Sequence, residues 1–343
     1  MPDSTWTILL RSSAELKGFV PQWKELWKED SSATPFQTPE WLLPWWNQFG
    51  QSELRAAVVF HRNLPTAFLP FYIAPDPETG ERKLLLLGVG TTDYLGGLFS
   101  SSCTLAQVRC GIRTLLQSDG WDSLVALQMK PGSLLCNALL QEGPGARHFS
   151  SADCSKMPAL PLEQLPTRIR RNALYYRNRA QRAGKLELRI AEASDCIDAF
   201  HCLQTLHTRR WNLRGEPGVL ADRRVLAWHR EAIPLLDRCG LLRLCTLLLD
   251  GEPLGVLYSL VDPGWRVPRT QYFYLTAFSP DHAELRPGTL LLAYAIDYAA
   301  REGVQVIDML RGQEVYKDLW HMRRFPTDGV SASAMDFDRE KTA

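Results

Sequence analysis

The helices and strands predicted from this sequence occur in the same order twice, and this repetition constrains the fold more than any single motif does. Hydrophobic periodicity and turn residues predict the order β-α-α-β-β-β-α-β-α in residues 1–155 and again in residues 185–343. No residue-by-residue repeat accompanies the repeated order. A chain of 343 residues is also long enough for two domains. We therefore expect two α/β domains with mixed sheets, joined by a basic linker helix at 156–184.

The elements of the second half carry most of the functional candidates. Strands are expected at 241–249, 253–261, 270–278 and 304–310, and helices at 195–211, 222–239, 287–302 and 314–322. Asp250 and Gly251 suit a two-residue hairpin turn between the first two of these strands. In the first half, one helix is expected at 14–29, and residues 149–165 are expected to form an irregular segment at the domain boundary.

Charge and cysteine usage exclude several classes of protein. The formal net charge is +1, so the chain as a whole has no electrostatic preference for DNA or anionic membranes. Its 8 cysteines include no C-x-x-C pair and no set with histidine at zinc spacing, so structural thiols and no bound metal are expected. Neither a signal peptide nor a membrane-spanning segment is recognised, which predicts a cytoplasmic protein.

One predicted helix near the middle of the chain is strongly basic. The segment 164–186 contains no acidic residue. Its seven basic residues are Arg168, Arg170, Arg171, Arg177, Arg179, Arg182 and Lys185. One interpretation is a docked helix with a solvated outer face. The other is an anion site at Arg168–Arg182 for a sugar nucleotide, a polysaccharide, a lipid head group or tRNA.

Five stretches carry recognisable motifs. One is IDMLRGQEVYKDLW at 307–320, a predicted strand followed by R-G-x-E-x-Y-K-x-x-W, and the others are 206–215, 286–291, 35–41 and 92–95. Together they resemble the CelD/BcsL (BioF2-like) acetyltransferases, a GNAT branch related to the Fem peptidyltransferases. The resemblance implies a tandem GNAT acyltransferase fold. The chemistry would lie in a domain at 185–343, and residues 1–155 would form a degenerate GNAT-like domain.

The start of the helix at 287 is the candidate donor site. Pro287 needs no N–H at the first helical turn, which leaves the N–H groups of Gly288, Thr289 and Leu290 to meet an anion beside Arg286. An ordinary helix start is the alternative. Many coenzyme A-binding GNAT proteins carry a second glycine in this turn, and this chain does not. Acyl-CoA and aminoacyl-tRNA, the donor of Fem relatives, therefore both remain open.

The stretch after the strand at 304–310 supplies the catalytic candidates. The resemblance implies that Lys317 lies near the transferred carbonyl, where an ammonium would stabilise negative charge. Tyr316 would protonate the leaving group, and Glu314 or Asp308 would accept the amine proton. The alternatives are a carboxylate that holds the turn at 311–312 for Asp308, and a carboxylate in a first helical turn for Glu314.

Two further groups are candidates for binding the acceptor. His207, Arg210 and Trp211 share one face of a predicted helix and would line a pocket, unless they form an exposed helix end. Asp93 and Tyr94 lie in a glycine-rich loop where Asp93 would meet an ammonium group, unless it caps a turn.

These residues predict an N-acyltransferase that moves an acyl group from acyl-CoA to an amine acceptor in envelope polysaccharide or lipid precursor synthesis. Peripheral contact with a membrane would fit a lipid acceptor. A Fem-like transferase that uses aminoacyl-tRNA is one alternative. A non-catalytic GNAT shell in an exopolysaccharide system is another. No G-x-S-x-G, H-E-x-x-H or P-loop motif supports a hydrolase, a zinc protease or an NTPase.

Overall fold

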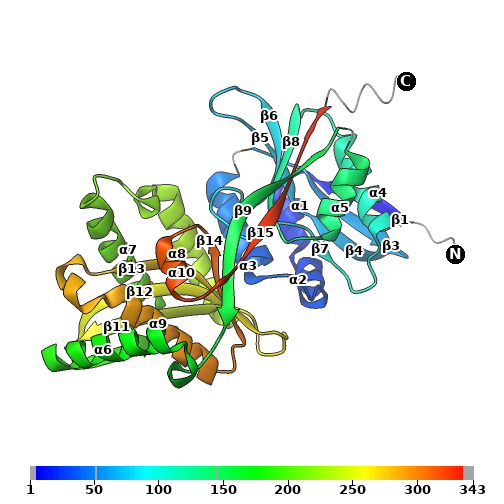
Figure 1. Cartoon of the computed structure of the whole chain (residues 1–343). Coiled ribbons are helices and arrows are strands. Elements are labelled where there is room, and N and C mark those ends of the chain that lie inside the picture. The colour runs from blue at the N-terminus through cyan, green and yellow to red at the C-terminus, as the bar shows by residue number, and fades with distance from the viewer. Residues whose placement is uncertain (1–4, 51, 144, 335–343) are drawn as a thin grey trace. The chain divides into compact units, whose positions relative to one another are not determined.

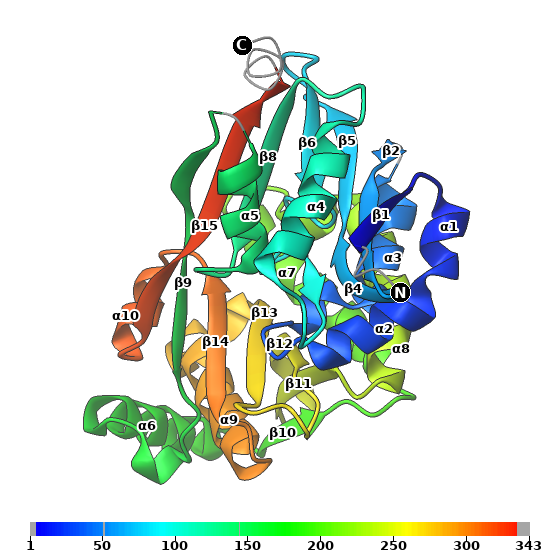
Figure 2. The same ribbon diagram turned by 90° about the vertical axis from the view of Figure 1, so that its right-hand side faces the viewer.

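The structure is a computed structural model that describes residues 5–50, 52–143 and 145–334. The chain separates into two compact units (Figures 1 and 2). Unit 1 comprises the described residues up to Asp153 and those from Phe325 onward, and unit 2 comprises Cys154–Arg324. No helix within the described ranges is long and apolar enough to cross a membrane.

Unit 1 contains two groups of paired strands and five α-helices. The first group has the order β1-β3-β4-β7, formed by Thr5–Leu10, Ala56–His61, Leu64–Leu69 and Leu98–Phe99. The second has the order β15-β8-β6-β5-β2, formed by Arg323–Ser333, Ser123–Met129, Arg82–Leu86, Phe71–Pro75 and Glu53–Leu54. The α-helices are α1 (Ser13–Gly18), α2 (Val20–Glu29), α3 (Pro39–Phe49), α4 (Leu105–Leu116) and α5 (Leu134–Glu142). A 3-10 turn, η1 (Pro35–Gln37), precedes α3.

The single helix expected at 14–29 is two helices. α1 ends at Gly18, and Pro21 occupies the first turn of α2. Proline has no N–H for the bond that a continuous helix would require at this position, whereas a first turn requires none. The helices α4 and α5 then cover the sheet with their apolar faces, where Val108, Ile112 and Leu135 are fully buried.

Unit 2 is built on six strands in the order β10-β11-β12-β13-β14-β9. The first five are Leu186–Ile190, Leu242–Leu249, Glu252–Val261, Thr270–Phe278 and Val306–Arg311, and β9 is Arg147–Pro158. Its α-helices are α6 (Thr167–Ala183), α7 (Cys196–Asn212), α8 (Arg223–Arg238), α9 (Pro287–Arg301) and α10 (Val315–Leu319). Three 3-10 turns accompany them, η2 (Leu162–Gln164), η3 (Val219–Ala221) and η4 (Pro280–Leu285). From β10 to α10 the element order is the predicted one.

The core of unit 2 surrounds α9. Leu290, Leu291 and Ile296 of this helix are fully buried. Each such side chain contributes about 1.5–3 kcal/mol by leaving water. The same core includes Ile169 and Ala173 of α6, so this basic helix is docked on unit 2. We expected residues 156–184 to be a linker helix. The helix in this range, α6, is instead packed into the core of unit 2.

The last strand of each half completes the sheet of the other unit. The end of β9 lies in unit 2, where residues 154–158 pair with β14. Conversely, β15 starts in unit 2 and pairs with β8 of unit 1 from Asp328 to Ser333. Residues 149–165 are therefore not the irregular boundary that we expected, and 185–343 do not all lie in one domain. Local sequence patterns do not predict this exchange, because a remote partner strand specifies each pairing.

Candidate active site

The parallel strands β13 and β14 separate after a short pairing. Their register covers three residue pairs, from Thr270–Val306 to Tyr272–Asp308, although β13 continues to Phe278. The pairing of β14 with β9 shifts between Asp308 and Arg311, so β14 bends at the same level. Because the strands are parallel, their carboxyl ends lie at the same edge of the sheet. This edge is where a ligand is expected in an open α/β sheet.

The N-terminus of α9 follows β13 at this edge. Gly288 packs against the Phe278 ring so closely that a β-carbon would lie 3.1 Å from it. The N–H groups of Thr289 and Leu290 donate to the Arg286 carbonyl at 3.0 and 3.2 Å. These two amides are therefore used within the protein, contrary to the expectation that they face an anion. The Gly288 N–H remains the candidate among the three, because no acceptor for it is found among the described residues.

Arg286 adopts an unusual backbone conformation before this helix. Its φ of 51° and ψ of 56° lie in the left-handed region, and its side chain is exposed. The cost of such a conformation for a residue other than glycine is of order 1–3 kcal/mol, and strained residues of this kind cluster at functional sites. The geometry therefore keeps Arg286 as a donor-site candidate.

Arg210 brings a second positive charge to the same place. Its guanidinium lies 4.2 Å from the centre of the Phe278 ring, the ring that also contacts Gly288. Burial, followed by the nearby Arg214, lowers the pKa of Arg210. The preceding Arg209 differs, because it pairs with Asp281 at 2.7 Å. For Arg210, no carboxylate partner is found in the described part of the chain.

Lys317 is held by its own loop. The ammonium donates to the carbonyls of Leu310, Arg311 and Gly312 at 3.3, 2.8 and 3.2 Å, and its Nζ lies 2.9 Å from the Glu314 carboxylate. The side chain is only 2% exposed. Four acceptors compete for three N–H protons, so these contacts favour a positioning role. The predicted role in charge stabilisation stays a prediction.

Tyr316 is partly exposed beside Glu314 and Arg210. It is 41% exposed, and partial burial followed by the nearby Glu314 charge raises its pKa to about 12. The phenol is therefore protonated at neutral pH. Arg210 is close enough to oppose this rise, so electrostatics link Tyr316 to the residue stacked on Phe278.

Asp308 has a local structural contact. Its Oδ1 accepts the N–H of Leu310 at 2.8 Å, and Leu310 has a φ of 57°. The carboxylate is 5% exposed. It thus supports the backbone of β14 at Leu310. Both its expected alternative, holding the turn at 311–312, and its role as a base stay predictions.

His207 and Trp211 form a packed pair on α7. Their ring centres are 5.8 Å apart, and a β-carbon at Gly218 would collide with both side chains. His207 is 4% exposed, and burial followed by the Arg210 charge lowers its pKa to about 4. The imidazole is therefore neutral at neutral pH. Because its pKa is so low, it is a weak base for removing a proton from an acceptor ammonium.

Asp93 and Tyr94 lie in unit 1. The two segments of unit 1 that resemble family landmarks pack together there: the Trp41 indole donates to the Thr92 hydroxyl at 3.0 Å, and Phe36 contacts Tyr94. Asp93 and Tyr94 are 5% and 2% exposed. The residues at the ends of β13 and β14 belong to unit 2, whereas Asp93 and Tyr94 belong to unit 1. The acceptor role of these two residues stays a prediction.

A buried aromatic cluster in unit 2 escaped the sequence analysis. His229 contacts the rings of Trp228, Phe200, Tyr258 and Tyr274, which come from four elements. Burial lowers the pKa of His229 to about 3. The sequence indicates only that His229 lies on the apolar face of α8. Its partners Tyr258 on β12 and Tyr274 on β13 are brought to it by the fold.

Removal of the Lys317 ammonium tests its positioning role. Lys317→Ala leaves three carbonyls and one carboxylate without this donor, and we expect a loss of about 3 kcal/mol in the free energy of unfolding, measured by urea titration. The control Lys185→Ala, at an 80% exposed side chain, is expected to change it by less than about 0.5 kcal/mol. Unchanged stability with lost turnover would instead support the catalytic prediction.

His207 predicts a pH dependence of stability. Its folded pKa of about 4 lies below the ordinary 6.5, so the unfolded chain binds more protons between these values. The contribution of neutral His207 is fully present above pH 6.5 and is lost as the pH falls through 4. His207→Gln should make the unfolding free energy less steep in this window, whereas His201→Gln, exposed on the same helix, should not. Identical slopes for both variants would contradict the buried neutral imidazole.

Comparison with known proteins places this geometry in a fold family. Residues 167–318 match the family model described as an acetyltransferase (GNAT) domain. The structure is similar to FemX, with a TM-score of 0.61 at 10% identity over 95% of this chain and 96% of that one. No match is found among curated proteins.

Two further structures share the fold. The C-terminal domain of a putative lysylphosphatidylglycerol synthetase from Agrobacterium fabrum has a TM-score of 0.59 at 12% identity, over 96% of this chain and 95% of that one. A tandem GNAT protein from the clavulanic acid biosynthesis pathway has a TM-score of 0.51 at 15% identity, over 96% and 99%. The chain thus has a tandem GNAT fold, residues 167–318 form an acetyltransferase domain of the GNAT type, and the protein is an acyltransferase.

Proposed function

We propose that unit 2 transfers an acyl group from acyl-CoA to the nitrogen of an amine acceptor, in the synthesis of an envelope polysaccharide or lipid precursor. The observation that carries the proposal is that two groups meet at the Phe278 ring at the end of β13. The first turn of α9 packs on this ring at Gly288, and the Arg210 guanidinium stacks on it, while the exposed Arg286 precedes the same helical turn.

This convergence suits a pyrophosphate. A helix N-terminus presents N–H groups and the positive end of the helix dipole, and both attract phosphate oxygens. Guanidinium groups add charge-assisted hydrogen bonds. Phe278 fixes the plane of the Arg210 guanidinium, so less side-chain entropy is lost when a phosphate binds.

The transfer itself requires two proton movements. The acceptor nitrogen attacks the thioester carbonyl, a C–N bond forms, and the C–S bond breaks. Tyr316, protonated at neutral pH, donates its proton to the departing thiolate. We assign the amine proton to Glu314, because its side chain is 53% exposed whereas Asp308 is buried against Leu310. With Lys317 engaged by its loop, backbone N–H groups of the diverging part of β13 are the candidates for stabilising the oxyanion.

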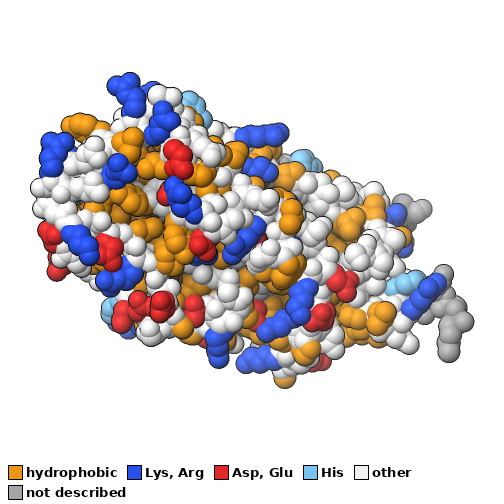
Figure 3. Space-filling view, turned by 90° about the horizontal axis from the view of Figure 1, so that it is seen from below, with side chains coloured by type: hydrophobic (Ala, Val, Ile, Leu, Met, Phe, Trp, Pro, Cys, Tyr) orange, Lys and Arg blue, Asp and Glu red, His pale blue; other side chains and the backbone are white. Residues whose placement is uncertain are grey.

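The acceptor is proposed to be lipid-linked or sugar-linked on the evidence of α6. Four arginines are exposed on this docked helix: Arg168, Arg171, Arg179 and Arg182. In the left-hand part of Figure 3, Lys and Arg side chains lie among apolar and some acidic ones. Such a surface suits a phosphate-bearing acceptor or an anionic membrane. The neighbour named as a lysylphosphatidylglycerol synthetase supports a lipid acceptor by fold analogy.

An aminoacyl-tRNA donor is the second candidate. The α9 turn holds a single glycine, and only one of its three predicted amides remains for a ligand. The fold similarity to FemX and the exposed arginines of α6 are consistent with this donor. The two candidates differ in whether coenzyme A compounds bind.

Adjacent arginines on α7 provide a matched test of the donor site. Arg210→Ala removes the guanidinium stacked on Phe278, and we expect the affinity for acetyl-CoA and longer acyl-CoA to fall about tenfold, which corresponds to one charge-assisted contact of about 1.4 kcal/mol. Arg209→Ala removes only an exposed pair with Asp281 and should change affinity by less than about twofold. The measurement is calorimetric titration. If wild-type protein binds no acyl-CoA, the aminoacyl-tRNA donor replaces this proposal.

Tyr316 is tested by separating binding from turnover. Tyr316→Phe keeps the ring and removes the acidic proton, so we expect kcat to fall about 100-fold with little change in the dissociation constant for the donor. The readout is release of free thiol with an amine acceptor. A variant with normal kcat would remove Tyr316 from the proton transfer.

A further inference from the structure

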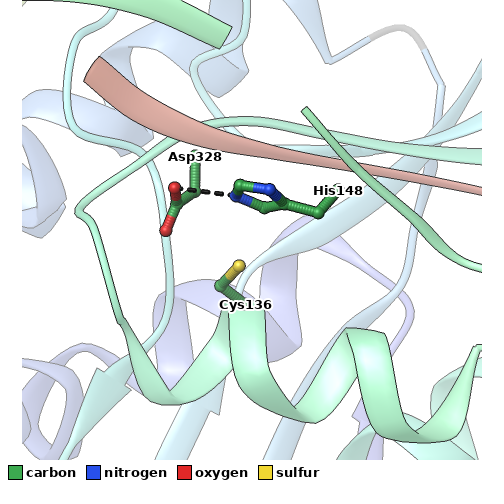
Figure 4. Close-up of side chains that lie close together, drawn as sticks. All are labelled: Cys136, His148 and Asp328. Carbon is green, nitrogen blue, oxygen red and sulfur yellow. Dashed lines mark hydrogen bonds and ion pairs between the residues drawn. The ribbon is translucent and has the colours of Figure 1, made fainter. Parts of the chain in front are cut away.

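Unit 1 brings together a thiol, an imidazole and a carboxylate that the transfer reaction does not use. Cys136 lies on α5, His148 on β9 and Asp328 on β15 (Figure 4). One candidate ligand atom from each residue lies within 4.8 Å of the other two. Cys136 is 2% exposed, whereas the His148 side chain is 50% exposed, so the cluster extends from the core to solvent.

An irregularity in the sheet accompanies the position of Asp328. The pairing of β15 with β8 shifts between Asp328 and Val330, and Gln128 on β8 has a φ of 57°. Such irregularities redirect side chains and are frequent beside functional sites. Gly329 fills the shift, where a β-carbon would lie 2.4 Å from the Phe149 ring. The site therefore depends on a local distortion of the ladder.

The carboxylate is already oriented by neighbours. Asp328 Oδ2 accepts the Gly132 N–H at 3.0 Å, and Oδ1 lies 2.9 Å from His148 Nε2. Figure 4 shows the Cys136 sulfur directed from α5 toward the gap between the carboxylate and the imidazole. A backbone hydrogen bond that fixes a ligating carboxylate is a usual feature around bound metals.

A nucleophilic cysteine is a poorer explanation of the same cluster. Cys136 is 2% exposed, so its sulfur is closed to a large substrate in solution, whereas the His148 side chain is 50% exposed and leaves an entry for a small ion.

We propose that Cys136, His148 and Asp328 form a Zn²⁺ site with its fourth position open to solvent beside His148. Sulfur, imidazole nitrogen and carboxylate oxygen are the three donor types that Zn²⁺ takes in proteins. Tetrahedral ligands about 2.0–2.3 Å from Zn²⁺ lie roughly 3.3–3.8 Å apart, so the 2.9 Å between His148 and Asp328 opens slightly on binding. The Cys136 proton passes to solvent as the thiolate binds.

The metal would tie β15 to the rest of unit 1. It links Asp328, on the part of β15 that lies in unit 1, to β9 and α5. This inference is independent of the acyl-transfer site, because all three ligands lie in unit 1. It departs from the expectation of no metal, since 180 residues separate His148 from Asp328 and no sequence motif joins them.

The experiment uses the full chain, treated with chelator and dialysed, and titrated with Zn²⁺ by calorimetry and with Co²⁺ by absorbance. We expect one Zn²⁺ per chain, a rise in Tm, and a thiolate-to-cobalt charge-transfer band. Cys136→Ser, His148→Gln and Asp328→Asn should each weaken Zn²⁺ binding at least about tenfold. Cys103→Ser and His201→Gln, which lie outside the cluster, should bind as wild type does.

The Asp328→Asn variant separates a loss of metal binding from a loss of folding. Asp328→Asn retains an oxygen to accept the Gly132 N–H, so its fold is expected to persist and its metal binding to be lost. Absence of a charge-transfer band in wild-type protein, or a band that survives Cys136→Ser, would overturn the proposal. Equal Zn²⁺ affinity of Asp328→Asn and wild type would also overturn it.

Discussion

The short parallel pairing of β13 and β14 is the constraint on which the rest of unit 2 depends. Three residue pairs hold the strands together, and the bend at Asp308 then separates them. If the ladder continued to Phe278, the α9 N-terminus would follow a closed sheet edge. Because the ladder stops at Tyr272 and Asp308, the rest of β13 does not pair with β14, and the first turn of α9 follows its free end.

Three cations near the carboxyl ends of β13 and β14 are satisfied in different ways. The Lys317 ammonium donates to carbonyls of its own loop. Arg209 pairs with Asp281. The Arg210 guanidinium stacks on the Phe278 ring. Cations that look alike in the sequence therefore have different surroundings in the structure.

Much of the fold could be predicted because its signals are local. Periodicity, the Asp250-Gly251 turn and the Pro287 helix start gave the element order from β10 to α10. The candidates for a donor site were predicted less completely. Gly288 and Arg286 follow from their place at a helix start, but Thr289 and Leu290 donate their N–H groups to the Arg286 carbonyl.

The sequence by itself determined the α/β class and the order of elements from β10 to α10, because short-range patterns encode them. It also supplied the group of candidate residues near the end of unit 2. Only the tertiary structure decided that the closing strands are exchanged, that α6 is docked, and that Cys136, His148 and Asp328 meet. Strand pairing and side-chain convergence join residues far apart in the chain, and the energies that select them come from partners that no local window contains.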